Sequence, residues 1–139
     1  MSFEHEHTVT TSASPSDVWR LWSDIATWPT WDPQVERVVL DGPFRVGTTG
    51  TMVLGGGIEM PFELLEVQLD ARYVDVLRMG ELEIRIDHLV RAVEGGAEVT
   101  VRTSIEGPGA DDIGPMVTAD APVAMAALTA MAEAGAPVS

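Results

Sequence analysis

Hydrophobic and polar residues alternate along most of the chain. The alternation is cleanest over 82–93, where the charged residues fall on one face and the apolar ones on the other. The apolar face carries Leu82, Ile84, Ile86, His88 and Val90. A period of two is typical of half-buried strands. It predicts strands at 3–11, 35–40, 48–54, 60–69, 72–79, 82–93 and 97–106.

A helical segment interrupts the strands after the first of them. Ser14 and Pro15 have the residue types of an N-cap and of a first helical position. Trp19 and Trp22 follow at a spacing of three, which places both rings on one face of a helix. The stretch 24–33 (DIATWPTWDP) adds Trp28 and Trp31, and its Pro29 and Pro33 should stop any helix from running through it, which predicts a short helical elbow. We expect Trp19 and Trp22 in the core, and Trp31 nearer a pocket.

The segment from Asp111 to Glu133 has helical periodicity and is rich in alanine and methionine; Gly135 and Pro137 end it. Its apolar stripe comprises Ile113, Met116, Val117, Ala124, Ala127, Leu128 and Met131. Asp120 falls within the stripe, and Pro122 should kink the helix or restart it.

The order of these elements predicts an α+β fold. A seven-stranded antiparallel sheet with one polar face needs a cover on its other face, and the C-terminal helix is the remaining cover. We therefore expect a curved sheet wrapped around a long C-terminal helix, with two short helices after the first strand and a cavity between sheet and helix. The 139 residues correspond to one domain, 1–139.

Composition and charge narrow the range of partners. A net charge of −14, with eight basic residues that are all arginine, disfavours binding to nucleic acid or to anionic membranes. The chain has no cysteine for a disulfide or thiol nucleophile, and no lysine for a Schiff base. No run approaches the roughly 20 apolar residues that span a bilayer, and the N-terminus lacks the pattern of a signal peptide. We expect a cytoplasmic protein.

Six segments carry a resemblance to a known family. They are 14–19 (SPSDVW), 24–33 (DIATWPTWDP), 47–50 (GTTG), 61–67 (PFELLEV), 86–90 (IDHLV) and 95–101 (GGAEVTV). With the order of elements, they make the chain resemble the START-like helix-grip (SRPBCC) superfamily, in particular its polyketide cyclase/dehydrase-like branch. The resemblance implies a hydrophobic cavity between sheet and helix. In cyclases of this type, polar side chains in the cavity are thought to assist aldol closure and dehydration of a poly-β-ketone.

Two residues are candidates for catalysis. His88 lies on the apolar face of the cleanest strand, where an imidazole could act as a general base or simply be a hydrogen-bonded buried group. Asp120 could pair with His88 across the cavity or with an arginine such as Arg20. Alternatively, Asp120 is the N-cap that restarts the helix before Pro122.

The predicted ligand-binding residues are Trp31, Tyr73, Ile86, Thr103, Met116, Val117 and Ala124. His5, His7 and His88 could in number form a zinc site, but no carboxylate ligand is clearly placed beside them. We therefore expect no metal and no cofactor.

Two classes of function remain open. The first is a cyclase/dehydratase that uses His88 and possibly Asp120 on an aromatic or polyketide-like substrate. The second is a carrier of hydrophobic small molecules or lipids without catalysis, which the scarcity of polar cavity residues favours. A regulator that docks on other proteins would need a large exposed apolar patch, and the sequence gives no sign of one. The chain is expected to be a monomer or homodimer.

Overall fold

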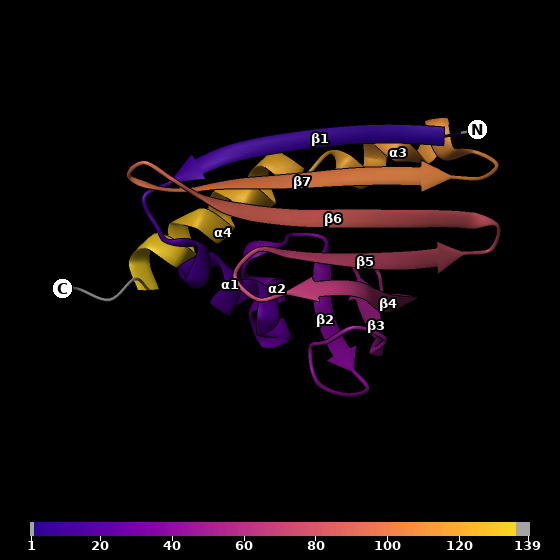
Figure 1. Cartoon of the computed structure of the whole chain (residues 1–139). Helices are drawn as coiled ribbons and strands as arrows, with labels where there is room; N and C mark the ends of the chain where they lie inside the picture. The colour runs from indigo at the N-terminus through magenta and orange to yellow at the C-terminus, as the bar shows by residue number, and fades with distance from the viewer. Residues whose placement is uncertain (1, 136–139) are drawn as a thin grey trace.

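A single antiparallel sheet organises the computed structural model, which describes residues 2–135. Its strands are β1 (Ser2–Thr11), β2 (Val35–Leu40), β3 (Thr49–Leu54), β4 (Ile58–Gln68), β5 (Arg72–Met79), β6 (Leu82–Val93) and β7 (Gly96–Glu106). They are ordered β1-β7-β6-β5-β4-β3-β2, so only β1 is displaced from its neighbour in sequence (Figure 1). The seven strands predicted from alternation are confirmed within two residues at each end.

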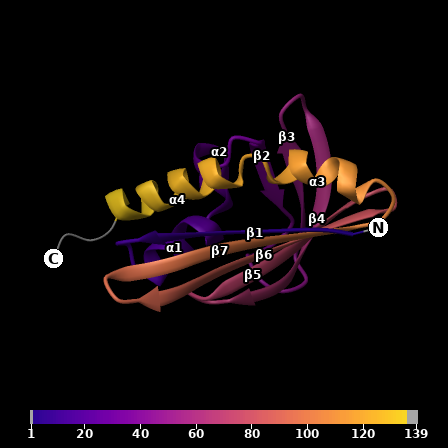
Figure 2. The same ribbon diagram turned by 90° about the horizontal axis from the view of Figure 1, so that it is seen from above.

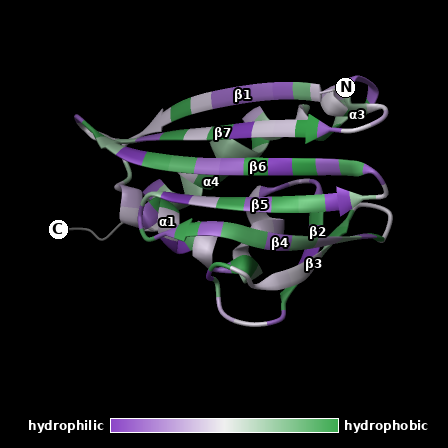
Figure 3. Cartoon of the chain, turned by 45° about the vertical axis from the view of Figure 1, so that its right-hand side comes forward, coloured by the Kyte–Doolittle hydropathy of each residue, from purple (hydrophilic) through white to green (hydrophobic). Residues whose placement is uncertain are grey.

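The two faces of the sheet differ in polarity, and Figure 3 shows hydrophilic and hydrophobic residues alternating along its strands. On β6, Ile84, His88 and Val90 are buried, whereas Glu83, Arg85 and Arg91 are exposed. A slip of one residue would expose this entire apolar set, so the burial of the inner face fixes the register.

The helical elbow predicted between β1 and β2 is confirmed. Helix α1 (Pro15–Ser23) begins at Ser14, whose side chain and that of Asp17 form a reciprocal capping box with the backbone. A 3-10 turn, η1 (Ile25–Thr27), and a short helix, α2 (Trp28–Trp31), follow. Pro29 does not end the helix but lies in the first turn of α2, where the missing N–H is tolerated.

The C-terminal helical region runs from Ala110 to Gly135 and is broken once. Helices α3 (Ala110–Thr118) and α4 (Ala121–Gly135) meet at Asp120, so the helix restarts before Pro122 instead of bending through it. In Figure 2 the two helices lie nearly end to end along one face of the sheet. Pro137 lies outside the described residues.

The helices cover the apolar face of the sheet, as predicted. Ala124 and Leu128 are buried, and Ile113 and Val117 are half-buried. Helix α3 approaches β1 so closely at Gly114 that a Cβ there would lie 2.3 Å from the ring of Phe3. Met116 is 70% exposed, so its predicted inward position is wrong. It lies two residues after the buried Gly114, about 200° around the helix.

By length and composition alone, the region Ala110–Gly135 could also cross a membrane. The expectation that no apolar run approaches such a length is therefore wrong, because the break at Asp120 hides the continuity of two apolar helices. A helix that covers an apolar sheet passes the same test. Here the buried residues of α4 include Met125, Leu128 and Ala132, which belong to the core.

Candidate functional site

A cavity of about 160 Å³ lies between the sheet, the helical elbow and the C-terminal helices. The sheet provides its floor through residues of β3 to β7, such as Met52, Ile84 and Val101. Helices α3 and α4 close the opposite side with Val117, Ala124 and Leu128. The cavity predicted from the order of elements is therefore present.

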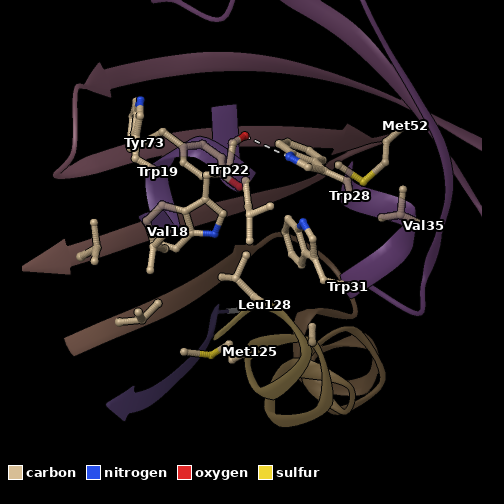
Figure 4. Close-up of a cluster of buried hydrophobic side chains, with 14 of the residues drawn as sticks. Val18, Trp19, Trp22, Trp28, Trp31, Val35, Met52, Tyr73, Met125 and Leu128 are labelled. Atoms are coloured by element: carbon tan, nitrogen blue, oxygen red, sulfur yellow. Dashed lines mark hydrogen bonds between the residues drawn. The ribbon is translucent and has the colours of Figure 1, made fainter. Parts of the chain in front are cut away.

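Aromatic rings form one wall of the cavity. Trp22, Trp28 and Trp31 reach it from α1 and α2, and Tyr73 reaches it from β5 (Figure 4). The indole N–H of Trp28 donates to the carbonyl oxygen of Trp22 at 3.0 Å, and that of Trp31 donates to Thr27 Oγ1 at 3.2 Å. These bonds fix two of the rings. Trp19 and Trp22 both pack in the core, as expected, and Trp22 in addition lines the cavity, which the sequence did not indicate.

His88 is buried in the cavity wall, 9% exposed, as the alternation of β6 predicted. Its ring stacks on Tyr73 with centroids 3.9 Å apart, and Nδ1 lies 3.3 Å from the carbonyl oxygen of Tyr73. A carbonyl oxygen only accepts, so Nδ1 carries the proton and Nε2 keeps a lone pair. Burial lowers the pKa of His88 to about 4, so the ring is neutral at physiological pH.

Tyr73 settles the face of β5 that the sequence left ambiguous. Its side chain is 1% exposed, lines the cavity and stacks against Trp28 as well as His88. Burial raises the pKa of its phenol well above the usual 10, and the nearby carboxylates of Asp75 and Asp32 raise it further. The hydroxyl therefore remains protonated.

Asp75 and Asp32 are cavity residues that the sequence analysis did not identify. Asp75 is 2% exposed, and burial raises the pKa of its carboxyl to about 7, with a contribution from Asp32. Burial also raises the pKa of Asp32, whose Oδ1 accepts from the backbone N–H of Gln34 at 3.0 Å. The available signal was the period of β5, because Asp75 must share a face with Tyr73.

Asp120 lines the cavity, but its partners are not the predicted ones. Its Oδ2 accepts from the side-chain amide of Gln34 at 3.3 Å, while Nδ1 of His88 bonds to a backbone carbonyl. Arg20 contacts Asp17 and the carbonyl of Gly135 instead. Asp120 directly precedes α4, and its carbonyl oxygen accepts from the N–H of Ala124 at 2.9 Å. It thus occupies the predicted cap position while its carboxylate points to Gln34.

The cavity brings together most of the predicted ligand-binding residues. Those that line it are Trp31, Tyr73, Ile86, Thr103, Val117 and Ala124. Met116 is outside, on the solvent side of α3. Within residues 2–135, no group of three or more His, Asp or Glu residues is arranged to hold a metal ion, and His5 and His7 are absent from the cavity wall.

Comparison with solved structures supports the assignment of the fold. Protein MLL2253 from Mesorhizobium loti superimposes with a TM-score of 0.83 at 13% identity, over 97% of this chain and 100% of that one. Norcoclaurine synthase from Thalictrum flavum, solved with dopamine and hydroxybenzaldehyde, superimposes with a TM-score of 0.77 at 17% sequence identity. The match covers 99% of this chain and 90% of that one. The di-domain ARO/CYC StfQ of steffimycin biosynthesis superimposes with a TM-score of 0.82 at 12% sequence identity, over 96% of this chain and 52% of that one.

Comparison of sequences gives a narrower result. No curated protein matches the chain significantly. A family model does match it, over residues 2–136, and its description is polyketide cyclase / dehydrase and lipid transport. This match spans nearly the whole sequence and agrees with the helix-grip arrangement of sheet, elbow and C-terminal helices. The chain therefore belongs to the polyketide cyclase / dehydrase and lipid transport family.

Proposed function

We propose that the chain binds a small, mostly apolar, ring-bearing molecule in the cavity. The observation that carries this proposal is a 160 Å³ space walled by Trp22, Trp28, Trp31 and Tyr73 and closed by aliphatic residues. Such concave, apolar sites with a few polar groups are typical of ligand pockets. An engineered protein cavity of about 150 Å³ accepts benzene. The space therefore suits about one aromatic ring with short substituents.

Family membership supports an aromatic or polyketide-like ligand within this class. The family description names polyketide cyclases and lipid transport, and StfQ is a di-domain ARO/CYC protein of similar fold. Norcoclaurine synthase, also of similar fold, was solved with two ring compounds. A long polyketide would exceed the cavity, so a compact ligand or a single ring of a larger one is the better fit.

Ligand binding can be tested with a pair of substitutions on α4. Ala124 is buried and lines the cavity, whereas Ala126, two residues later, is exposed. Ala124→Phe should fill the cavity and abolish the quenching of tryptophan fluorescence by a small ring compound such as 2-phenylethanol. Ala126→Phe should leave that quenching unchanged. Native mass spectrometry of the purified protein should in addition detect a co-purified apolar compound. Equal binding by both variants would place the ligand elsewhere and contradict the proposal.

A second candidate function, a cyclase/dehydratase reaction, is favoured by the state of His88. Its Nε2 has a free lone pair that can accept a proton in an apolar cavity, because Nδ1 bonds to the carbonyl of Tyr73. In an aldol closure, Nε2 would take a proton from a carbon next to a carbonyl. That carbon would then bond to a second carbonyl carbon, whose oxygen would take the proton back from His88. Elimination of water would follow.

The catalytic role of His88 can be separated from a structural one. His88→Gln keeps a similar size and a hydrogen-bond donor for the Tyr73 carbonyl, but the amide cannot transfer protons at neutral pH. If the protein turns over the co-purified compound, the variant should lose on the order of 100-fold in kcat while its affinity changes little. Full turnover in the variant would remove His88 from the mechanism, whereas a wild-type protein without any turnover would leave the carrier function.

A further inference from the structure

Three carboxylates reach the cavity from three separate parts of the chain. Asp75 comes from β5, Asp32 follows α2, and Asp120 lies between α3 and α4. They are electrostatic neighbours, since Asp32 raises the pKa of Asp75 and Asp120 raises that of Asp32. Like charges gathered in an apolar space repel one another, so this arrangement costs free energy in the empty protein.

Asp75 is the most confined of the three. Its side chain is 2% exposed, and its Oδ1 has no hydrogen-bond partner among residues 2–135. Buried polar atoms almost always have a partner, and those without one call for a specific explanation. Because Asp75 lines the cavity, a ligand in the cavity can supply the missing donor.

No positive charge faces these carboxylates within the cavity wall. The wall contains no arginine, the chain has no lysine, and His88 is neutral near pH 7. Among residues 2–135, the side chains of Asp32 and Asp120 accept hydrogen bonds only from neutral donors of Gln34. The ion pairs between described residues involve other carboxylates throughout.

The surrounding rings add a second feature that favours a cation. Trp28, Trp31 and Tyr73 line the same space as the carboxylates. The face of an aromatic ring attracts a positive charge, and tryptophan does so most strongly. The described residues provide no group of three or more ligands for a metal ion, which favours an organic cation over a metal ion.

We infer that the ligand of the cavity carries a protonated amine, whose N–H groups bond to Asp75 and whose charge is balanced by Asp32 and Asp120. This inference rests on the proposed function, because it specifies the class of the ring-bearing ligand. The apolar part contacts the tryptophans and α4. The ammonium group lies beside Asp75.

This arrangement makes binding depend on pH. The other titratable groups that line the cavity are Asp32, Asp120, Tyr73 and the neutral His88. An ammonium group beside Asp75 favours the ionised carboxyl. Since the pKa of Asp75 is about 7, an amine must release a proton from Asp75 to bind in weakly acidic solution. Its affinity should therefore rise about tenfold between roughly pH 6 and pH 8. A neutral ligand that accepts a hydrogen bond from protonated Asp75 would show the opposite trend.

A matched pair of probes tests the inference. 2-Phenylethylamine and 2-phenylethanol have nearly the same shape, but the amine is a cation in this pH range, like a lysine side chain with a pKa of about 10.4. Quenching of tryptophan fluorescence gives both affinities. At roughly pH 8 the amine should bind on the order of tenfold more tightly than the alcohol.

Two variants complete the test. Asp75→Asn should weaken amine binding on the order of tenfold and remove its pH dependence, while binding of the alcohol stays within about threefold. Retained alcohol binding also shows that the variant is folded. Asp111→Asn removes the same charge from an exposed position on α3 and should behave as the wild type.

Each alternative outcome identifies what fails. Equal affinity for amine and alcohol, or amine affinity that falls with rising pH, would overturn the inference and leave the proposed function in place. The same holds if Asp75→Asn binds the amine as the wild type does. If neither probe binds, the inference and the proposed function both fail.

Discussion

In the described part of the chain, carboxylates on the outer face of the sheet form ion pairs, whereas those on the inner face do not. On the outer face, Arg72 donates to Asp87 through Nε at 2.8 Å and Nη2 at 2.9 Å, and to Glu66 through Nη1 at 2.9 Å. One residue further along each strand, Tyr73 and His88 stack on the inner face without any charge. The side chains of a strand alternate, so neighbours in sequence belong to different environments.

This difference shows that the arginines pair with carboxylates outside the cavity and not with those that line it. The described ion pairs lie outside the cavity, although burial raises the pKa of two cavity carboxylates, Asp32 and Asp75. A buried carboxylate that served stability alone would be paired or absent. Inner carboxylates without a counter-charge support the proposed binding role. The contrast between the two faces can be tested by equivalent changes on each of them.

The largest expected difference concerns packing. Tyr73→Ala on the inner face should cost about 3–5 kcal/mol of unfolding free energy, because it removes a buried ring that contacts Trp28 and His88. Arg72→Ala, its neighbour on the outer face, should cost only about 1 kcal/mol, because its ion pairs are partly solvated. Urea unfolding near neutral pH measures both. Similar losses would contradict the division between the two faces.

The second prediction is that an Asp→Asn substitution changes the free energy of unfolding in opposite directions on the two faces. Asp75→Asn should stabilise the protein by roughly 2–4 kcal/mol at about pH 8, because the folded state there must hold a buried charge. The folded pKa of Asp75 is raised to about 7, so its stability deficit is absent below the unfolded pKa and grows as the pH rises to about 7. Asp87→Asn should instead destabilise, by about 1 kcal/mol, because Arg72 loses two charge-assisted bonds.

Urea unfolding at several pH values provides the measurement for both aspartate variants. The gain from Asp75→Asn should vanish below roughly pH 3, where the carboxyl is protonated in both the folded and the unfolded state. A gain that does not depend on pH would show that Asp75 is not the group that titrates.

The third prediction concerns His88, whose folded pKa is lowered to about 4 by burial. The contribution of His88 to the free energy of unfolding is fully present above its unfolded pKa of about 6.5. Roughly 2–3 kcal/mol of it is lost as the pH falls toward the folded pKa. This slope opposes that of Asp75 between about pH 4 and pH 6.5. In the His88→Gln variant, the dependence of unfolding free energy on pH should therefore show the slope due to Asp75. In the Asp75→Asn variant it should show the slope due to His88. A flat profile in both single variants would refute the two shifts.

The smallest expected effect is that of salt. Raising the ionic strength to about 1 M shortens the Debye length to about 3 Å, which screens partly exposed pairs. The cost of Arg72→Ala should shrink by a few tenths of a kcal/mol, while the gain from Asp75→Asn should stay nearly constant. Equal salt sensitivity of the two variants would indicate that solvent reaches Asp75.

The sequence predicted the fold well, because the sheet and the elbow follow local rules. Alternation on β6 placed His88 inside, and Ser14 with Pro15 marked the start of α1. The position of Met116 was predicted wrongly, because a single apolar stripe was assumed to continue through the break at Asp120. The face of α3 that points inward is instead set by its packing on β1.

The electrostatics of the cavity depend on contacts between distant segments, which a pattern along the chain does not contain. Asp32, Asp75 and Asp120 come together only when β5, the elbow and the α3–α4 junction pack around one space. Pairing of Asp120 with His88 was plausible from the sequence, but Gln34 takes that place. Asp75 was visible only as one acidic residue in a strand of uncertain face.

The most direct test of the contrast between the faces is an NMR titration of the Asp75 side-chain carboxyl carbon, with and without ligand. The carboxyl should titrate at about 7 in the free protein. Saturation with 2-phenylethylamine should lower this pKa, because the ammonium group favours the ionised form, whereas 2-phenylethanol should not lower it. A free-protein value near the ordinary 3.8, or a pKa that the amine leaves unchanged, would contradict the account.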